Sequence, residues 1–285
     1  TQGVSSAASD VYKRQDLPSR AGWDASVARV LELVSEGDLD KVVLARKTTF
    51  GFETELDPLL CLQALLLEAE RCYRFCFVPA GGRAFIGASP ERLYRREGRR
   101  ILCDAIAGTR TRGDGASLDR QLERELMSSE KERREQNYVV RGIRESLATM
   151  CGSLVDGGGL SVVKLRQCQH LMSTFDGMLL DSVDDADLLK TLHPTPAVGG
   201  YPTDCAVRVI EEGEPFDRGW YAGPMGWIGR DSAEFAVAIR SGLVDGSTLS
   251  AFAGAGIVAG SVSGEEWREL DYKISHFAQA LNLPR

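Results

Sequence analysis

The sequence predicts a mixed α+β fold with largely antiparallel sheets, on three observations. Strand-like runs occur in clusters, helical segments separate these clusters, and the regular strand–helix alternation of a parallel doubly wound sheet is missing. Because no fixed-period repeat and no Pro/Ser/Gly-rich linker divides the chain, we expect one folded domain over residues 16–285. Residues 1–15 show neither helical nor strand periodicity, and the sequence begins with Thr1. We therefore interpret them as a disordered or non-native lead-in outside the fold.

The spacing of apolar residues places the individual elements. Helical spacing predicts helices over residues 25–34, 58–69, 118–150, 203–212 and 265–285. Runs rich in Val, Ile and Phe predict strands over residues 41–49, 74–78, 84–88, 100–107, 225–228, 234–244 and 248–258. The last two strands flank Asp245-Gly246, a dipeptide typical of hairpin turns.

Composition narrows the possible partners. The net charge of −7 argues against a surface that grips nucleic acid or anionic lipid, and no window approaches the roughly 20 apolar residues of a membrane span. Seven cysteines form an odd set without a CxxC pair, which favours free thiols in a reducing, intracellular compartment. We therefore expect a protein without nucleic-acid or membrane partners, either a monomer or a weak dimer.

Two pairs of glutamates share a spacing of three residues. Glu132 and Glu135 lie in SSEKERREQN, which has no apolar side chain, so a solvated helix face is the ordinary interpretation. Glu266 and Glu269 repeat the spacing, although Glu266 also fits a capping box with Ser263. If the two helices face each other, the carboxylates form an all-oxygen site that suits Mg²⁺, whereas three histidines make a zinc site improbable.

The C-terminal third contains groups that could hold an anion. Gly254, Gly256 and Gly260 lie between a strand and a helix, where backbone amides can approach a ligand closely, but their spacing misses the dinucleotide-binding fingerprint by one residue. Arg240 lies in an apolar strand and needs either a structural ion pair or a bound carboxylate. Lys273 follows Glu269 by four residues, the spacing of an ordinary helix ion pair.

Nine segments in order resemble the chorismate-utilising enzymes, a family that includes isochorismate, salicylate, anthranilate and aminodeoxychorismate synthases. They span about residues 23–277 and read DKVVLARK, FIGASPERL, DAIAGTRTRG, KERREQNYVV, HPTPAVGGYPT, YAGPMGWIG, EFAVAIRS, AFAGAGIV and EEWRELDYK. The resemblance implies the family fold, in which two large, mostly antiparallel sheets pack together with flanking helices. It also makes residues 16–285 the chorismate-binding catalytic domain, shorter at its N-terminus than family members generally are.

The resemblance also implies which residues bind magnesium and substrate. Glu135 and Glu269 would bind Mg²⁺, with Glu132 and Glu266 contributing directly or through water. The remaining implied substrate-binding positions are Gly108 and Thr109 for the ring carboxylate, Arg240, Lys273 and the amides of Gly254, Ala255 and Gly256 for the enolpyruvyl group, and His193, Ala197 and Tyr221 in the pocket wall.

By the same resemblance, Lys41 would act as general base and Glu91 as general acid. Isochorismate forms when water attacks C2 of the ring while the C4 hydroxyl, a poor leaving group, gains a proton. Lys41 would then have to be neutral and Glu91 protonated, and burial favours both neutral forms. On their own, the two residues read as a lysine at the start of a strand and a glutamate in a turn after a proline.

Ala197 indicates which member of the family the chain is most similar to. Amine-forming and lyase-type members usually carry threonine there, whereas isochorismate synthases usually carry alanine. The resemblance is closest to isochorismate synthases of menaquinone and phylloquinone synthesis, which implies a cytoplasmic enzyme, or one of the plastid stroma in a photosynthetic eukaryote. The alternatives are salicylate synthase, the synthase component of an anthranilate or aminodeoxychorismate enzyme, and an inactive chorismate-binding paralogue.

Overall fold

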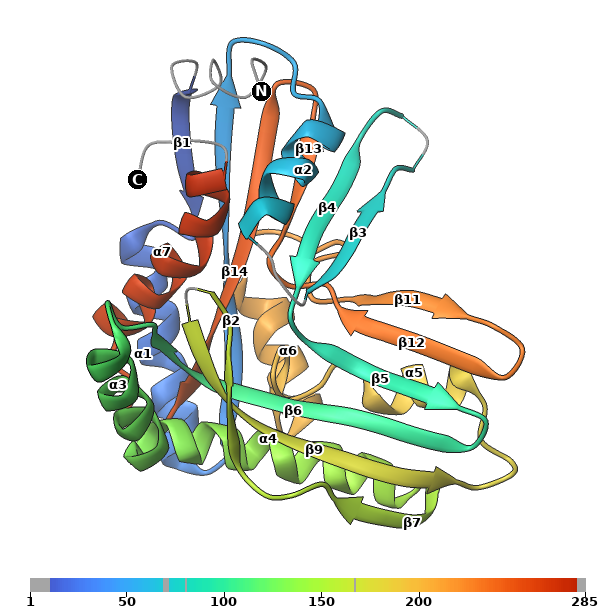
Figure 1. Ribbon diagram of the computed structural model, residues 1–285. Coiled ribbons are helices and arrows are strands. Elements are labelled where there is room, and N and C mark those ends of the chain that lie inside the picture. The colour runs from blue at the N-terminus through green and yellow to red at the C-terminus, as the bar shows by residue number, and fades with distance from the viewer. Residues whose placement is uncertain (1–10, 69–71, 80, 167, 281–285) are drawn as a thin grey trace.

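The computed structural model describes residues 11–68, 72–79, 81–166 and 168–280, and their strands form two sheets (Figure 1). All strand pairings among these residues are antiparallel. The expected α+β class with antiparallel sheets is therefore confirmed.

The first sheet has the strand order β1-β2-β14-β13-β4-β3, with β10 also paired to β2. Asp245 pairs with Thr248 across the β13–β14 turn, where Gly246 has a φ of 56°, so the expected hairpin is confirmed. The strands are β1 (Val11–Leu17), β2 (Lys41–Phe52), β3 (Tyr73–Phe77), β4 (Ala84–Ser89), β10 (Gly200–Tyr201), β13 (Ser241–Asp245) and β14 (Thr248–Val258).

The second sheet has the order β11-β12-β5-β6-β9-β7, with β8 also paired to β9. Its strands are β5 (Arg92–Glu97), β6 (Arg100–Thr111), β7 (Cys151–Asp156), β8 (Ser161–Lys164), β9 (Cys168–Leu179), β11 (Pro224–Ile228) and β12 (Ser232–Val237).

The helices cover the outer faces of the sheets. Helices α1 (Arg20–Glu36) and α7 (Ser263–Ala280) pack against β14, α2 (Pro58–Glu68) packs against β4, and α6 (Thr203–Gly213) packs against β2. Helix α4 (Glu130–Ala148) runs beneath β6 and β9, with α3 (Ala116–Ser128) and α5 (Asp185–Leu192) beside it (Figure 1). Helix α4 thus packs mainly on the second sheet, whereas α7 packs on the first.

Two apolar clusters form the core. In the first, Trp23, Val27 and Val30 point from one stripe of α1 against the first sheet. In the second, α4 contributes Val139, Ile143 and Leu147 at intervals of four residues. The helical spacing visible in the sequence is thus the spacing that fills both cores, since only one face of each helix is buried.

Two short connections carry the chain directly from a strand of one sheet to a strand of the other, and they lie side by side. Residues 90–91 connect β4 of the first sheet to β5 of the second, and residues 238–240 connect β12 of the second to β13 of the first. The backbone N–H of Ala88 donates to Arg240 O at 3.2 Å, and that of Val237 donates to Glu91 O at 3.0 Å. The two crossings therefore hold Glu91 and Arg240 at the junction of the sheets.

The prediction of a single strand over residues 234–244 was wrong, because the chain changes sheets within it. Arg240 has a φ of 51°, a left-handed conformation that a strand does not accommodate. Phe235 consequently pairs with Tyr94 in one sheet while Leu243 pairs with Phe85 in the other. The continuous apolar pattern arises because both halves are buried.

The prediction of one helix over residues 118–150 was also wrong. Ser129 is extended, with φ −68° and ψ 116°, and its hydroxyl accepts a hydrogen bond from the Glu132 N–H at 3.4 Å as the N-cap of α4. The stretch without apolar side chains therefore contains a helix boundary, after which α4 starts in a new direction.

Part of the N-terminal segment that was expected to lie outside the fold forms a strand of the first sheet. Residues 11–15 lie in β1, which pairs with β2 up to the contact of Leu17 with Lys47. The expected lead-in is thus corrected for these five positions, and residues 1–10 lie outside the described residues. Strand β9 was not predicted either, because its sequence CQHLMSTFDGML mixes polar and apolar residues without clean alternation.

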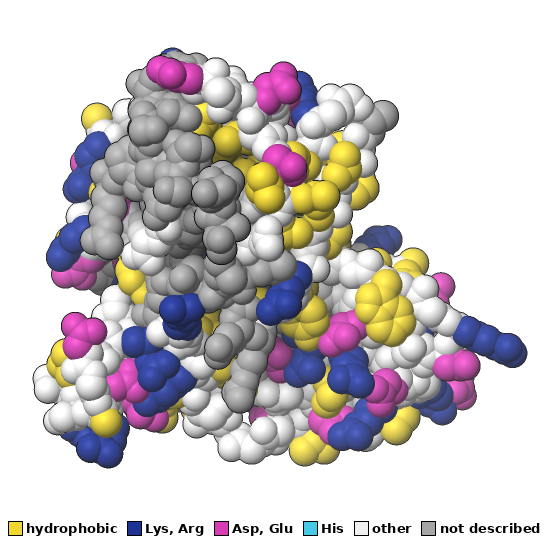
Figure 2. All heavy atoms as spheres, turned by 45° about the horizontal axis from the view of Figure 1, so that its top comes forward, with side chains coloured by type: hydrophobic (Ala, Val, Ile, Leu, Met, Phe, Trp, Pro, Cys, Tyr) yellow, Lys and Arg dark blue, Asp and Glu magenta, His cyan; other side chains and the backbone are white. Residues whose placement is uncertain are grey.

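Exposed apolar side chains gather at the β3 edge of the first sheet and on the neighbouring helix α2. Acidic and basic side chains are interspersed over much of the face in Figure 2, whereas apolar ones gather near α2, β3 and β4. Leu59 and Leu60 of α2 and Phe77 of the edge strand β3 are among the exposed ones. None of the described helices combines the length and the apolar composition needed to cross a bilayer.

The α3–α4 boundary generates a prediction about stability. Ser129→Ala removes the N-cap of α4 and should lower the free energy of unfolding by about 1 kcal/mol in urea titrations. Ser128→Ala is the control, because the Ser128 hydroxyl donates only to Glu125 O on an exposed face, and its effect should stay within about 0.5 kcal/mol. Equal effects of the two substitutions would contradict the capping role.

Candidate active site

A cavity lies where the two sheets meet, next to both crossings between them. Its wall contains residues from β2, β6, β14, α4 and α7. Of the residues that the sequence singles out, those lining it are Glu91, Gly108, Thr109, Glu135, Ala197, Tyr221, Arg240, Gly254, Gly256, Glu269 and Lys273. Eight separate segments of the chain are thus brought to one place.

Lys41 is the first residue of β2 and is fully buried. Its Nζ lies 3.1 Å from Glu135 Oε1, so the lysine is paired with one of the carboxylates expected to bind metal. A Cβ on Gly256 would lie 2.2 Å from the same Glu135 oxygen and 3.1 Å from Lys41 Cε. Only glycine at position 256 therefore leaves room for this pair.

Glu91 follows Pro90 at the crossing from β4 to β5 and is 4% exposed. Its backbone N–H donates to the Ser89 hydroxyl at 3.2 Å. Burial raises the pKa of the Glu91 carboxyl to about 7, although the positive charge of Lys41 opposes this shift. The structure thus favours a Glu91 that still carries its proton near neutral pH.

Glu132 is buried beside the AIAGT segment of β6. Its Oε2 accepts a hydrogen bond from the Thr109 N–H at 3.1 Å. Gly108 has a φ of 72°, and a Cβ there would lie 3.0 Å from the same Glu132 oxygen, so this close approach requires glycine. Burial, together with the charge of Glu135, raises the pKa of Glu132.

Glu266 is not part of a capping box, and that prediction was wrong. The Ser263 hydroxyl donates instead to Asp24, and Glu266 is buried with its Oε1 2.6 Å from Lys131 Nζ. Burial raises the pKa of Glu266 to about 7, while the Lys131 ammonium works against that shift. Lys131, which the sequence interpretation left out, therefore joins α4 to α7.

Glu269 and Lys273 form the predicted i,i+4 ion pair, with Oε1 and Nζ 2.6 Å apart. Burial alone would raise the pKa of Glu269, but the Lys273 ammonium lowers it overall. The Lys273 Nζ also donates to Gly254 O at 2.7 Å. Lys273 thus connects α7 to β14 and also lines the cavity.

Arg240 lines the cavity and is half-buried, with its Nη1 atom shielded from solvent. Its Nη1 has no hydrogen-bond partner among the described residues. A buried charged donor without a partner is costly, and an anionic ligand would satisfy it. Of the two alternatives left open by the sequence, an unpaired Nη1 in the cavity wall favours a bound carboxylate over a structural ion pair.

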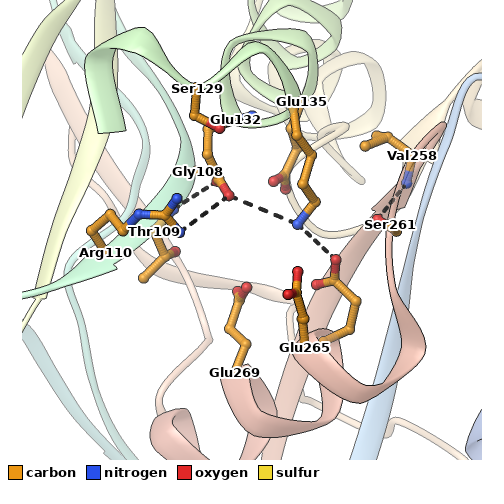
Figure 3. A network of polar contacts seen from close by, with 12 residues as sticks. Gly108, Thr109, Arg110, Ser129, Glu132, Glu135, Val258, Ser261, Glu265 and Glu269 are labelled. Carbon is orange, nitrogen blue, oxygen red and sulfur yellow. Dashed lines mark hydrogen bonds and ion pairs between the residues drawn. The ribbon is translucent and has the colours of Figure 1, made fainter. Parts of the chain in front are cut away.

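The four glutamates fit a magnesium site in their chemistry and direction. Figure 3 shows Glu132 and Glu135 on α4 pointing toward Glu269 on α7, and oxygen-only donor sets suit Mg²⁺. In this structure the carboxylates are paired with lysines, since Lys131 contacts Glu266 and Glu132, Lys41 contacts Glu135 and Lys273 contacts Glu269. Among the described residues, no three acidic, histidine or cysteine side chains are close enough to hold one ion.

Two implied substrate-binding positions do not face the cavity. His193 lines an adjoining groove on the far side of Tyr221, and its Nε2 lies 2.9 Å from Ala222 O. The Ala255 side chain is buried in the apolar core of the first sheet, because alternate residues of β14 point to opposite faces. Gly254 and Gly256, one residue to either side, do line the cavity.

The cavity also contains His170, which the sequence interpretation did not single out. Its Nδ1 lies 3.1 Å from both Gly108 O and the Thr109 hydroxyl, and its Nε2 lies 3.2 Å from Cys168 Sγ. Burial alone would raise the pKa of the Cys168 thiol, but the neighbouring His170 lowers it to about 7. His170 lies in strand β9, which was not predicted, so no periodic pattern in the sequence indicated its place in the cavity.

The contacts of Lys131 generate a prediction about cation binding. Lys131→Met removes an ammonium that neutralises Glu266 and lies 3.8 Å from Glu132, so Mg²⁺ should bind at least about tenfold more tightly in calorimetric titrations. Lys164→Met is the control, because Lys164 contacts Asp119 and Glu123, each at 2.9 Å, in another acidic cluster. Unchanged or weaker Mg²⁺ binding in Lys131→Met would contradict the idea that the lysine occupies the cation's place.

Comparisons with known proteins agree with this geometry. A chloroplastic isochorismate synthase of Arabidopsis thaliana is 41% identical over 274 residues, which are 95% of this chain and 49% of that protein. An isochorismate synthase of Bacillus subtilis is 39% identical, over 92% of this chain and 56% of its own length. This chain thus spans about half the length of these curated relatives.

Solved structures show the same fold. The menaquinone-specific isochorismate synthase of Escherichia coli matches with a TM-score of 0.90 and 35% identity, over 95% of this chain and 63% of that one. Component I of anthranilate synthase from Streptococcus pneumoniae matches with a TM-score of 0.80 and 26% identity, over 94% and 60% of the two chains. The family model described as "Chorismate binding enzyme" matches residues 2–282. With its two-sheet fold and its acidic cavity, the chain therefore belongs to the chorismate-binding enzymes.

Proposed function

We propose that this chain converts chorismate to isochorismate, as the catalytic domain of an isochorismate synthase. The observation that carries the proposal is that Glu91, whose pKa burial raises to about 7, lines the same cavity as Glu135, the partner of Lys41. The similarity to isochorismate synthases over nearly the whole chain supports the same reaction.

Glu91 has the properties that the general acid of this reaction requires. The C4 hydroxyl leaves as water only if it is protonated, and a carboxyl group with a raised pKa supplies that proton near pH 7. Glu91 lies where the chain passes from one sheet to the other. The hydrogen bond from Val237 N–H to Glu91 O, at 3.0 Å, limits its movement. The acid is thus part of a rigid wall rather than of a surface loop.

Lys41 is the proposed base that removes a proton from water as it attacks C2. A general base must lie within reach of the proton that it removes, and Lys41 Nζ lies 3.1 Å from Oε1 of Glu135, which lines the cavity. The shared carboxylate oxygen therefore connects the base to the proposed metal site.

Mg²⁺ is the proposed cofactor, held by Glu135 and Glu269 with Glu132 and Glu266 contributing directly or through water. When bound, it would neutralise the glutamates and hold the ring carboxylate of chorismate. Thr109, next to the left-handed Gly108, and the unpartnered Arg240 Nη1 are the proposed protein donors to the two carboxylates of the substrate. Tyr221 and Ala197 complete the wall.

The wider setting is also a proposal. The match to a menaquinone-specific synthase and to chloroplastic enzymes supports a role in menaquinone or phylloquinone synthesis, in the cytoplasm or the plastid stroma. We propose residues 16–285 as the catalytic domain, extended to include the residues of β1, in a monomer or weak dimer. Chorismate is the proposed small-molecule partner.

The proposed reaction predicts the origin of one oxygen atom in the product. Chorismate incubated with protein and Mg²⁺ in water labelled with oxygen-18 should yield isochorismate that carries one labelled oxygen at C2, read by chromatography with mass spectrometry. Release of pyruvate with salicylate would indicate the lyase instead. Recovery of unlabelled chorismate alone would indicate an inactive binding protein.

The acid and base assignments predict the effect of two substitutions. Lys41→Ala and Glu91→Gln should each lower kcat at least about 100-fold, while chorismate still binds in equilibrium titrations. Glu97→Gln, which changes an exposed carboxylate at the end of the adjacent strand β5, is the control and should leave kcat unchanged. Near-normal kcat in either variant would overturn the assignment of that residue.

The raised pKa of Glu91 predicts a pH dependence. The acid is competent only while protonated, so kcat/KM should fall as the pH rises through about 7, where burial places the Glu91 pKa. A profile of kcat/KM against pH measures this limb in the free enzyme. Activity that stays constant well above this pH would show that Glu91 is not the proton donor.

A further inference from the structure

One edge of β2 has a gap in its strand pairing beside the cavity. Strand β14 pairs along β2 from Lys41 to Gly51 on one edge. On the other edge β1 reaches only to Lys47, and β10 pairs only with Lys41 and Val42. On this edge no described strand pairs with the stretch between them, residues 43–46, where the Val43 N–H binds only the backbone of Gly199, at 2.8 Å from its O.

Two side chains fill this gap. The Ala45 N–H donates to Glu214 Oε1 at 2.8 Å, and Arg218 Nη2 donates to Val43 O at 2.7 Å. Arg218 and Glu214 are joined to each other by contacts of 2.6 and 2.7 Å. An ion pair thus satisfies the backbone groups that a neighbouring strand would otherwise bind.

Arg218 also reaches the segment that carries Ala197. Its Nη1 donates to Val198 O at 2.9 Å, so a single guanidinium holds Val43, Val198 and Glu214 together. Val43, Ala197 and Val198 all line the cavity, and Tyr221, three residues after Arg218, lines it too. The planar fork of arginine makes these contacts at once, which the single ammonium of a lysine cannot do.

We propose that Arg218, with Glu214, is a positioning residue that fixes the distance between the β2 wall and the Ala197 segment and thereby sets the affinity for substrate. Lys41 does not depend on this contact, because β14 pairs with it through Val258 and β10 through Tyr201. Loss of Arg218 therefore widens the pocket without moving the base. The choice of chorismate as the probe rests on the proposed function.

A merely structural ion pair would stabilise the fold without setting the affinity, and the chain contains such a pair for comparison. Arg96 binds Asp185 through contacts of 2.9 and 2.6 Å and also donates to Gly98 O at 2.9 Å. Its burial is similar, since the side chains of Arg96 and Asp185 are 12% and 11% exposed and those of Arg218 and Glu214 are 16% and 5% exposed. The pair joins β5 to α5, and neither residue lines the cavity.

The test compares Arg218→Met with Arg96→Met in the full chain, with chorismate and Mg²⁺. Arg218→Met should raise KM at least about tenfold while kcat changes less than about threefold, the pattern of lost ground-state binding. Arg96→Met should leave KM within about twofold, although it lowers the melting temperature. Arg218→Lys and Glu214→Gln should give intermediate KM values and carry the test if Arg218→Met does not fold.

Hydrogen exchange provides a second readout that does not require turnover. Arg218→Met should speed amide exchange in residues 41–46 and 194–200, whereas Arg96→Met should speed it in residues 92–98 and 184–192. An unchanged KM in Arg218→Met, or a fall in kcat alone, would overturn the proposal. If wild-type protein does not turn over chorismate, the proposed function fails, and unchanged exchange in residues 41–46 and 194–200 would overturn the positioning role separately.

Discussion

The structure of this site depends on two hydrogen bonds between backbone segments that cross from one sheet to the other. Ala88 N–H binds Arg240 O, and Val237 N–H binds Glu91 O. Each of these connections carries one cavity side chain, so Glu91, the proposed acid, and Arg240, the proposed anion ligand, are positioned by main chain rather than by mobile loops. The backbone of the two connections therefore gives the cavity a rigid wall at the junction of the sheets.

Charge balance is the second constraint on the cavity. Two of the glutamates, Glu132 and Glu266, are buried and Glu135 and Glu269 are partly so, which is unfavourable unless each is protonated, hydrogen-bonded or paired, and the structure uses all three means. Glu266 has its pKa raised to about 7, Glu132 accepts from Thr109 N–H, and Lys41 and Lys273 pair with Glu135 and Glu269. Three lysines thus surround a place that suits a divalent cation, and their ammonium groups supply positive charge there.

The sequence predicts the elements that have a regular apolar spacing better than it predicts the positions of the polar residues. Helices with one buried face, such as that of Val139 and Ile143, follow the spacing rule directly, and so do strands β2, β4 and β14 of the first sheet. Strand β9 and the break at Arg240 could not be predicted, because tertiary pairing decides them. The resemblance named many of the residues that line the cavity, whereas His193 lines an adjoining groove and the Ala255 side chain lies in the first core, and single-residue spacing could reveal neither Lys131 nor Arg218.

The two short connections between the sheets have a consequence for folding. Each sheet has an inner strand whose continuation belongs to the other sheet, since β4 leads into β5 and β12 leads into β13. Neither sheet can therefore detach without straining the short connections that hold Glu91 and Arg240. Partly unfolded molecules with one intact sheet lack part of the cavity wall, so the cavity and the cooperative fold of the whole domain are lost and regained together.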